Sequence, residues 1–417
     1  MTAVGVTAEE RLARAVLGHL AEPGRLDLWL LVHDVGPVEA LERIRAAAVA
    51  AGLRDVVGPR LAAADVSART AEALEECARL GGRLVVPGDD EWPAASLHGL
   101  TLLAVRRARD PGASPGAHLA PPLGLWVRGP RRLAETTARS VAVVGARAAT
   151  GYGGHVAAEL AYGLADRGWG VVSGGAYGID AAAHRGALAA GGGAAADAGV
   201  ADEGGTVAVL ACGVDTAYPV GHAALFERIA ERGLLVSEWP PGASPRRHRF
   251  LVRNRVIAAL TAGTVVVEAA ARSGALATAR RAHDLGRVLM AVPGPVTSAM
   301  SVGAHQLVRE CDARLVTSAA EVVEEVGALG VDLATRPQVP ETWRDLLGPV
   351  AGAVLDVLSR RPLSVEEVAA EAGVTVEDAA ALLPTLIRCG AAERVGRRYG
   401  AVRRAVWEQR TVLPPVR

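Results

Sequence analysis

Short apolar runs alternate with helical patterns along the middle of the chain. Six runs are rich in apolar and β-branched residues, and they cover 140–144, 170–173, 206–210, 234–237, 264–268 and 288–292. Helical spacing of apolar residues follows the first two runs, over 153–167 and 180–190. Continuous apolar strands separated by helices are typical of a parallel sheet that is covered on both faces. The pattern therefore predicts an α/β fold whose core is a Rossmann-like, doubly wound and mostly parallel sheet.

Helical patterns also precede and follow this core. Residues 7 to about 80 are predicted to form short helices, the first of which is capped by Thr7. Near the C-terminus, three helical patterns and a pair of short strands at 393–400 are typical of a winged helix. We therefore predict a helical domain of the SAM or helix-hairpin-helix (HhH) type at 1–80, the Rossmann-like core at 81–334, a proline-containing linker at 335–349 and a winged-helix-like domain at 350–417. Two stretches, 106–124 and 191–205, are predicted to be irregular.

The roles of the two flanking domains stay open. The N-terminal helices are consistent with contact to a DNA backbone, and at least as consistent with a small packing module. In the C-terminal domain the third helical pattern begins with acidic residues and carries one arginine, whereas a recognition helix presents Arg, Asn, Gln or Ser to base edges. Arg394, Arg397 and Arg398 in the strand pair are candidates for phosphate contacts. DNA contact and protein contact are equally consistent with this domain.

Composition narrows the class of protein. The 417 residues include 45 basic and 45 acidic side chains, and every basic residue is an arginine. Because the net charge is zero, any nucleic-acid surface must be a local patch. The four cysteines are far apart and form no CxxC pair, which argues against a zinc site or a disulfide framework and fits a reducing cytosol. With no signal-peptide pattern and no membrane-span pattern, we expect a cytoplasmic protein without a membrane partner, metal or cofactor.

The strongest local charge lies in residues 244–255. This stretch holds five arginines and Phe250, one of only two phenylalanines, and no carboxylate occurs between Glu238 and Glu268. Guanidinium groups fork onto phosphates, and an aromatic ring among them offers a stacking face for an unpaired base. The segment favours a binder of single-stranded nucleic acid, with a solvated basic loop as the alternative. The sequence does not separate arginines that would contact DNA from those that would hold the segment.

Glycine-containing turns follow the predicted strands at one edge of the sheet, where open α/β sheets bind their ligands. Gly145 precedes Arg147 after the first strand, and Ser173 precedes two glycines after the second. Glycines there let backbone N–H groups approach an anion, and the following helix N-termini add partial positive charge. Several such turns, with the arginine segment between two of them, predict a phosphate-binding edge.

Two rival functions depend on other features of the chain. A nucleotide-processing enzyme of the lysine-decarboxylase-like phosphoribohydrolase type would use the turn at Ser173 and Glu268, but its Pro-Gly-Gly-x-Gly-Thr turn is replaced here by a sequence that starts at Arg272. A DNA-binding regulator would use the winged-helix-like domain, against which the acidic third helix argues. No GxGxxG, GxxxxGK[ST] or GxSxG motif is present. Asp180 and His184 have a spacing that could bind a metal, but no third ligand is evident.

An ordered set of motifs resembles the DNA-processing protein A (DprA/Smf) family. The motifs occupy 141–147, 172–184, 237–242, 250–257, 267–269, 272–279 and 292–294. The resemblance implies a cytosolic single-stranded DNA-binding protein of natural transformation and homologous recombination, and not an enzyme. It further implies that the protein protects incoming strands and loads the RecA recombinase. The expected assembly is a homodimer, with single-strand-binding protein as a further partner.

Carried over residue by residue, the resemblance implies a set of DNA contacts and a set of supporting residues. The expected DNA contacts are Arg147, Ser173, Gly174, Tyr177, Arg249, Phe250, Arg253, Asn254 and Arg255. Arg147 and Arg253 are expected to hold phosphates, and Phe250 is expected to stack on a base. The expected supporting residues are Gly145, Gly175, Asp180, Glu268, Ser273, Gly274 and Thr278. Tyr177 stands where the family often has arginine, so a direct phosphate charge is lost at that turn.

Overall fold

The computed structural model describes residues 5–62, 65–110, 118–190, 205–328, 331–334, 348–358, 361–388 and 390–402. Contacts divide the chain into two compact units, 1–335 and 336–417, and each is described by itself. The predicted linker at 335–349 lies outside the described residues apart from its last two positions. The predicted irregular segment at 191–205 lies outside them apart from Gly205.

A nine-stranded sheet forms the centre of the first unit, in the order β1-β2-β6-β5-β4-β3-β7-β8-β9. The strands are β1 (Gly82–Val85), β2 (Leu125–Arg128), β3 (Ser140–Val144), β4 (Gly170–Ser173), β5 (Thr206–Val209), β6 (Leu234–Ser237), β7 (Gly263–Val266), β8 (Val288–Ala291) and β9 (Arg314–Leu315). From β6 to β9 all neighbours are parallel, whereas β1 and β2 form an antiparallel edge on β6. The prediction of an α/β fold with a mostly parallel sheet is confirmed.

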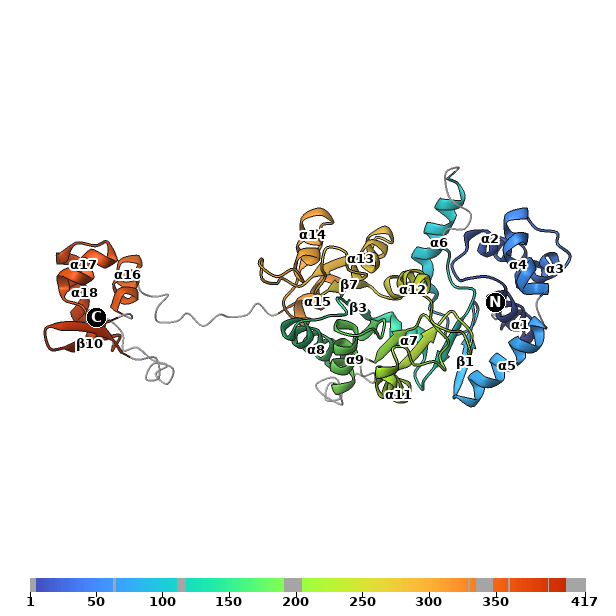
Figure 1. Ribbon diagram of the computed structural model, residues 1–417, viewed down its shortest axis with the longest axis horizontal. Coiled ribbons are helices and arrows are strands. Elements are labelled where there is room, and N and C mark those ends of the chain that lie inside the picture. The colour runs from blue at the N-terminus through green and yellow to red at the C-terminus, as the bar shows by residue number, and fades with distance from the viewer. Residues whose placement is uncertain are drawn as a thin grey trace. The chain divides into compact units, whose positions relative to one another are not determined.

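Helices cover both faces of this sheet. One face carries α8 (Gly151–Asp166), α9 (Ile179–Ala189) and α15 (Ala319–Val326). The other carries α6 (Ala94–Ala108), α12 (Arg247–Leu260), α13 (Ala275–Asp284) and α14 (Val302–Glu310). Figure 1 shows α12 and α13 on the opposite side of β3 and β7 from α8 and α9. Successive strand residues face opposite ways, so Val141 and Val143 of β3 pack with α8 while Ala142 and Val144 pack with α12.

Two further helices connect strands of the sheet. They are α7 (Leu133–Ala138), between β2 and β3, and α11 (Ala223–Arg232), between β5 and β6. A single 3-10 turn, η1 (Val220–His222), precedes α11. The buried residues Phe226 and Ile229 of α11 pack against Ala208 of β5 and Leu235 of β6.

Five helices precede the sheet, as the sequence predicted. They are α1 (Ala8–Leu20), α2 (Leu26–Val35), α3 (Pro37–Arg45), α4 (Ala51–Ala62) and α5 (Val66–Arg79). At the start of α1 the Thr7 side chain accepts from the backbone of Glu10 at 3.1 Å, and the Glu10 side chain accepts from the backbone of Thr7 at 3.0 Å, forming a capping box. The helices share one apolar core, and a second core joins Ala15 and Cys77 to Leu84 of β1. The helices therefore pack as part of the same unit as the sheet.

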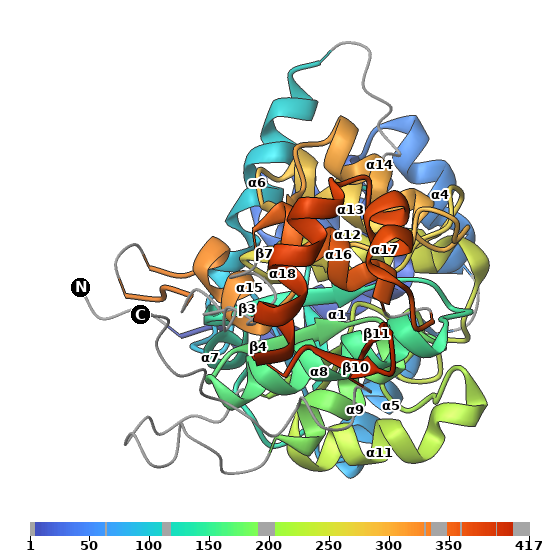
Figure 2. The same cartoon turned by 90° about the vertical axis from the view of Figure 1, so that its left-hand side faces the viewer.

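The second unit contains three helices and a hairpin. They are α16 (Pro349–Leu358), α17 (Val365–Ala372), α18 (Val376–Arg388), β10 (Ala392–Val395) and β11 (Arg398–Ala401), drawn in red and orange in Figure 2. The strands pair antiparallel, and the helices bury a common core with Leu363 and Ala392. These elements lie where the sequence predicted them, and the winged-helix class stays a prediction.

Two local predictions differ from the structure. The arginine segment at 244–255 is not a loop, because α12 begins at Arg247, two residues after Pro245. Residues such as arginine, leucine and alanine after the proline favour a helix, and proline is well tolerated before one. The stretch at 106–124 was predicted to be irregular, but its first residues are the last turn of α6.

Candidate nucleic-acid interface

An open pocket of about 1000 Å³ lies beyond the carboxyl ends of β3, β4 and β7, against the first turns of α12. We call it the rim pocket. Its polar and aromatic lining consists of Arg147, Asp180, Tyr218, Arg247, His248, Phe250, Arg253, Asn254, Arg272, Ser273 and Thr278, and Gly145 and Gly274 complete the turns. This is the edge at which a parallel α/β sheet presents its ligand site. The structure therefore brings together residues from five separate stretches of the sequence.

Arg147 and Phe250 form one wall of the rim pocket. Arg147 follows β3 and is exposed, and its guanidinium carbon lies 5.2 Å from the centre of the half-buried Phe250 ring. A cation at this distance over an aromatic face is attracted by the ring. In the described part of the chain no carboxylate is paired with Arg147. A free guanidinium fork and a stacking face thus lie side by side.

Arg253 braces the floor of the pocket. It is buried, and its Nη1 donates to the carbonyl oxygen of Gly174 at 2.8 Å and also to that of Val209. Burial lowers the pKa of Arg253 to about 10, while the neighbouring Asp180 acts in the opposite direction. Asp180 accepts hydrogen bonds from the backbone N–H groups of Gly174 and Ala176 at 3.2 and 3.3 Å. Arg253 is therefore a positive charge held between the ends of β4 and β5, and not a mobile arm.

Three more polar groups of the pocket have no partner among the described residues. Arg247 and Arg272 are exposed and unpaired, and the amide of Asn254 makes no hydrogen bond although most of this side chain is buried. The lining contains four arginines but a single carboxylate, that of Asp180. The pocket is therefore basic, and it offers free donors to an anionic ligand.

Two of the predicted arginine contacts lie outside the pocket and are engaged by carboxylates of the protein itself. Arg249 is buried, and its Nη2 and Nε donate to the two carboxylate oxygens of Glu22 at 2.8 and 3.1 Å. Arg255 is fully buried, and its Nη2 donates to Glu238 at 2.6 Å. The helical period explains the difference, because positions 247, 250 and 254 share the face of α12 that lines the pocket. Arg249 and Arg255 thus hold α12 in the protein, and a DNA contact for either residue stays a prediction.

Three predicted contacts at the end of β4 and in the turn after it, Ser173, Gly174 and Tyr177, are not part of the pocket lining. Ser173 is fully buried, and its hydroxyl donates to the backbone of β3 at 2.7 Å. Gly174 has no room for a side chain, because a Cβ there would lie 2.5 Å from Nη2 of Arg253. Tyr177 is exposed and lies edge-on against His222, with ring centres 4.6 Å apart. Ser173 and Gly174 therefore shape the floor, and Tyr177 stands outside the lining.

Some of the predicted supporting residues line the pocket, and others hold the backbone around it. The Glu268 carboxylate accepts from the backbone N–H of Thr150 at 2.9 Å and from its hydroxyl at 2.6 Å, which anchors the start of α8 behind the pocket. The Ser273 hydroxyl accepts from the backbone N–H of Ala275 at 3.3 Å, at the start of α13. Gly175, with a φ of 68°, packs against the Phe226 ring. The supporting residues that line the pocket are Gly145, Asp180, Ser273, Gly274 and Thr278.

Three side chains of the pocket lining were not predicted from the sequence as contacts, namely Tyr218, Arg247 and Arg272. Arg247 precedes Phe250 by three residues, so a helix prediction for this segment would have placed both on one face. Arg272 lies in a motif that was recognised, but its side chain was given no role. One feature of the sequence pointed to Tyr218 as a lining residue. It lies in the turn after the predicted strand at 206–210, and this turn is at the same edge of the sheet.

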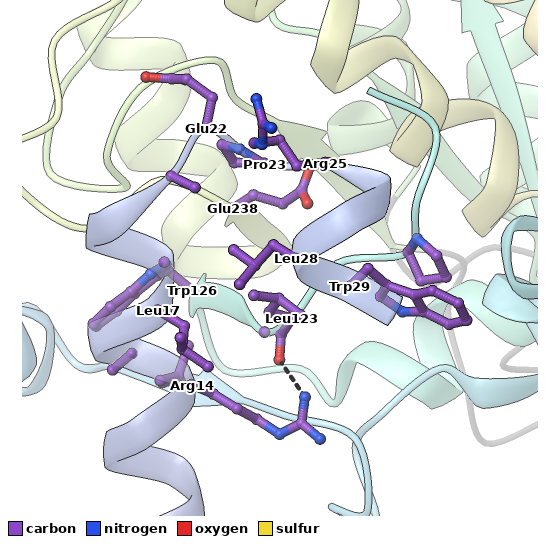
Figure 3. A pocket seen from close by; sticks show the side chains of 17 residues that line it. Arg14, Leu17, Glu22, Pro23, Arg25, Leu28, Trp29, Leu123, Trp126 and Glu238 are labelled. Carbon is purple, nitrogen blue, oxygen red and sulfur yellow. Dashed lines mark hydrogen bonds between the residues drawn. The ribbon is translucent and has the colours of Figure 1, made fainter. Parts of the chain in front are cut away.

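A second, enclosed cavity lies between the N-terminal helices and the sheet (Figure 3). Its volume is about 30 Å³, which suits water and excludes a nucleotide. Arg14 donates to the carbonyl oxygen of Leu123 at 3.2 Å beside it, and Glu238 forms part of its wall. This cavity belongs to the packing of the helices on the sheet.

Neither a metal-binding cluster nor a membrane-spanning helix is found among the described residues. Among the residues with described positions, no group of three or more His, Cys, Asp or Glu side chains is arranged to hold a metal ion. His184 is fully buried with Nδ1 2.8 Å from the Thr206 hydroxyl, and the neighbouring Asp180 faces backbone N–H groups. None of the described helices combines the length and the apolar character that crossing a bilayer requires.

Comparison with known proteins identifies the family. The model of the family described as DNA recombination-mediator protein A matches residues 113–327, which include every strand and turn of the rim pocket. A protein named putative DNA processing protein DprA, from Mycobacterium tuberculosis, is 47% identical over 91% of this chain and 92% of its own length. The chain belongs to the DNA recombination-mediator protein A (DprA/Smf) family. The resemblance that the motifs indicated is thereby confirmed.

Other members of the DprA/Smf family agree with this assignment. Protein Smf of Escherichia coli is 36% identical over 65% of this chain and 70% of its own length. The X-ray structure of DNA processing protein A from Streptococcus pneumoniae has a TM-score of 0.58 and 27% identity, and the match covers 78% of this chain and 100% of that chain. Membership places the chain among DNA-processing proteins of recombination.

Proposed function

We propose that this protein binds single-stranded DNA in the rim pocket. The observation that carries the proposal is the Arg147 guanidinium 5.2 Å over the Phe250 ring, at the wall of a basic pocket on the carboxyl edge of the sheet. Basic grooves with aromatic stacking faces bind unpaired strands, because phosphates meet the cations while bases stack on the rings. A duplex keeps its bases stacked inside and leaves such a ring unused.

We assign some side chains of the pocket to the phosphates of the strand and others to its bases. The exposed Arg147, Arg247 and Arg272 are proposed to bind phosphates, because each has a free guanidinium fork. Phe250 stacks on a base, and the Asn254 amide hydrogen-bonds to a base edge or the backbone. The buried Arg253 adds a fixed positive charge and orders the backbone of the turn after β4. Contacts of this kind carry little sequence preference.

We propose a binding role and not catalysis. The two carboxylates nearest the pocket are both engaged by the protein itself. Asp180 accepts from backbone N–H groups of the turn after β4, and Glu268 accepts from Thr150 at the start of α8. Both therefore serve to shape the pocket, which supports a site that holds a strand in place.

The biological role that we propose is that of a recombination mediator in natural transformation. The protein would protect an incoming single strand, load RecA onto it as a cytoplasmic homodimer, and meet single-strand-binding protein on the same DNA. Membership of the DprA/Smf family and the pocket support this role. RecA-catalysed ATP hydrolysis on strands coated with single-strand-binding protein tests it. The wild type should shorten the lag, and a variant unable to bind DNA should not.

Fluorescence anisotropy with labelled oligo-dT tests the site. The Arg147→Ala/Arg247→Ala variant should bind more weakly than wild type, and the magnitude of its slope of log K against log salt should fall by about 1.4, since each phosphate contact to a single strand contributes about 0.7. Arg54→Ala/Arg185→Ala removes two other exposed arginines, which lie outside the pocket, and should bind like wild type. Equal binding by the wild type and the pocket variant would move the DNA site elsewhere.

A further inference from the structure

Tyr218 lies next to Phe250, on which the Arg147 guanidinium also packs. Its ring centre lies 5.6 Å from that of Phe250, with the two ring planes tilted by 50°. Tyr218 comes from the turn after β5, Phe250 from α12 and Arg147 from the turn after β3. Three separate segments thus place a cation and two aromatic rings next to one another in the lining of the rim pocket.

The fold itself makes little use of the Tyr218 side chain. It is 42% exposed, and among the described residues its hydroxyl has no hydrogen-bond partner. Tyr152, by comparison, is similarly exposed but donates to the carbonyl oxygen of Pro293 at 2.7 Å. Within the described part of the chain, the ring of Tyr218 contacts one other ring, that of Phe250. An exposed aromatic ring with a wet polar tip, held at the edge of a basic pocket, is suited to contact a ligand.

The tilt between the two rings decides how they can be used. Parallel rings in contact would cover each other and leave one outer face each, whereas rings tilted by 50° do not lie face to face. One base can then lie on Phe250 and the neighbouring base on Tyr218. The flanking arginines remain on the phosphate side of the strand.

We infer that Tyr218 is a second base-stacking platform, so that the rim pocket holds two successive unpaired bases. The inference rests on the proposed function, because it assumes that single-stranded DNA occupies this pocket. It assigns the ligand chemistry of Tyr218 to the base and not to the phosphate. Stacking accepts every base, so the platform adds affinity without adding sequence preference.

Titration of variants against two strands tests this role. The strands are oligo-dT and an abasic strand of equal length, which keeps the phosphates and lacks the bases. Tyr218→Ala should bind oligo-dT roughly 5- to 150-fold more weakly, the range found when one stacking ring is removed. It should bind the abasic strand like wild type, with an unchanged salt slope. Tyr218→Phe keeps the ring and should stay within about twofold of wild type on both strands.

Tyr162→Ala is the matched control, because Tyr162 is 44% exposed on α8 and lies outside the pocket lining. An equal loss for Tyr218→Ala on both strands, or no loss on oligo-dT, would overturn the stacking role. In either case a loss of binding by Arg147→Ala would leave the proposed function standing. If Arg147→Ala and Tyr218→Ala both bind oligo-dT like wild type, the proposed function fails together with the inference.

Discussion

Glu22 should be the main link between the N-terminal helices and α12, the helix that carries several of the proposed DNA contacts. Glu22 lies between α1 and α2, and its carboxylate accepts two hydrogen bonds from Arg249 in the first turn of α12. It also accepts from the Trp239 indole at 2.9 Å and from Arg60 at 3.3 Å. We expect Glu22→Gln to destabilise the protein, because the charge of Arg249 would lose its partner in a position that is only 9% exposed.

The magnitude follows from the protonation of Glu22. Burial alone would raise the pKa of Glu22, but hydrogen bonds from Arg249 and Trp239 and the charges of Arg249 and Arg60 lower it from 4.5 to about 2. At about 1.4 kcal/mol per pKa unit, this difference corresponds to roughly 3 kcal/mol. The carboxylate is partly in contact with solvent, which screens the interaction, so we expect Glu22→Gln to lower the free energy of unfolding by about 2 kcal/mol at pH 7.

The same reasoning gives the pH dependence. The folded-state pKa of Glu22 is lower than its unfolded value, so its contribution is complete above about pH 4.5 and is lost as the pH falls toward about 2. Urea unfolding at a series of pH values should show that the difference between wild type and Glu22→Gln shrinks over this window. Glu39→Gln removes the acid of an exposed pair with Arg43 and should change stability by less than about 0.5 kcal/mol. If Glu22→Gln were no more destabilising than Glu39→Gln at pH 7, the argument would be refuted.

Two further substitutions test how the sheet and its helices are held. Glu238→Gln leaves the fully buried Arg255 without a counter-charge and should cost about 3–5 kcal/mol in urea unfolding, whereas Glu238→Leu/Arg255→Met, which removes both charges, should cost less. Gly186→Ala should lower the melting temperature, because a Cβ there would overlap the Ala158 carbonyl where α9 meets α8; Gly154→Ala on α8, which meets nothing within 4 Å, should leave it unchanged or raise it.

The parallel part of the fold could be predicted because its strands are buried on both faces. Such strands are continuous apolar runs, and six of them were located from composition and flanking turns. The antiparallel edge gave a weaker signal. β2 follows a proline pair and a stretch that was predicted to be irregular, so its sequence resembles the end of a loop. The short helix α7 and most of α6 were not predicted from the sequence.

The location of the site could be predicted from the sequence more reliably than the individual residues that line it. Turns after parallel strands must meet at one edge, so Arg147 and Asp180 were expected at the same edge as the arginine segment. The arginines of α12 could not be sorted without the helix and their distant partners. Arg249 is paired with Glu22, 227 positions earlier in the chain, and no local pattern in the sequence indicates that contact.

A crystal structure of the protein with a short oligo-dT tests the central claim most directly. The account predicts a strand in the rim pocket, with a phosphate on Arg147 and one base against the Phe250 ring. Oligonucleotide bound elsewhere, for example along Arg394 and Arg398 of the C-terminal hairpin, with the rim pocket free of DNA, would contradict it.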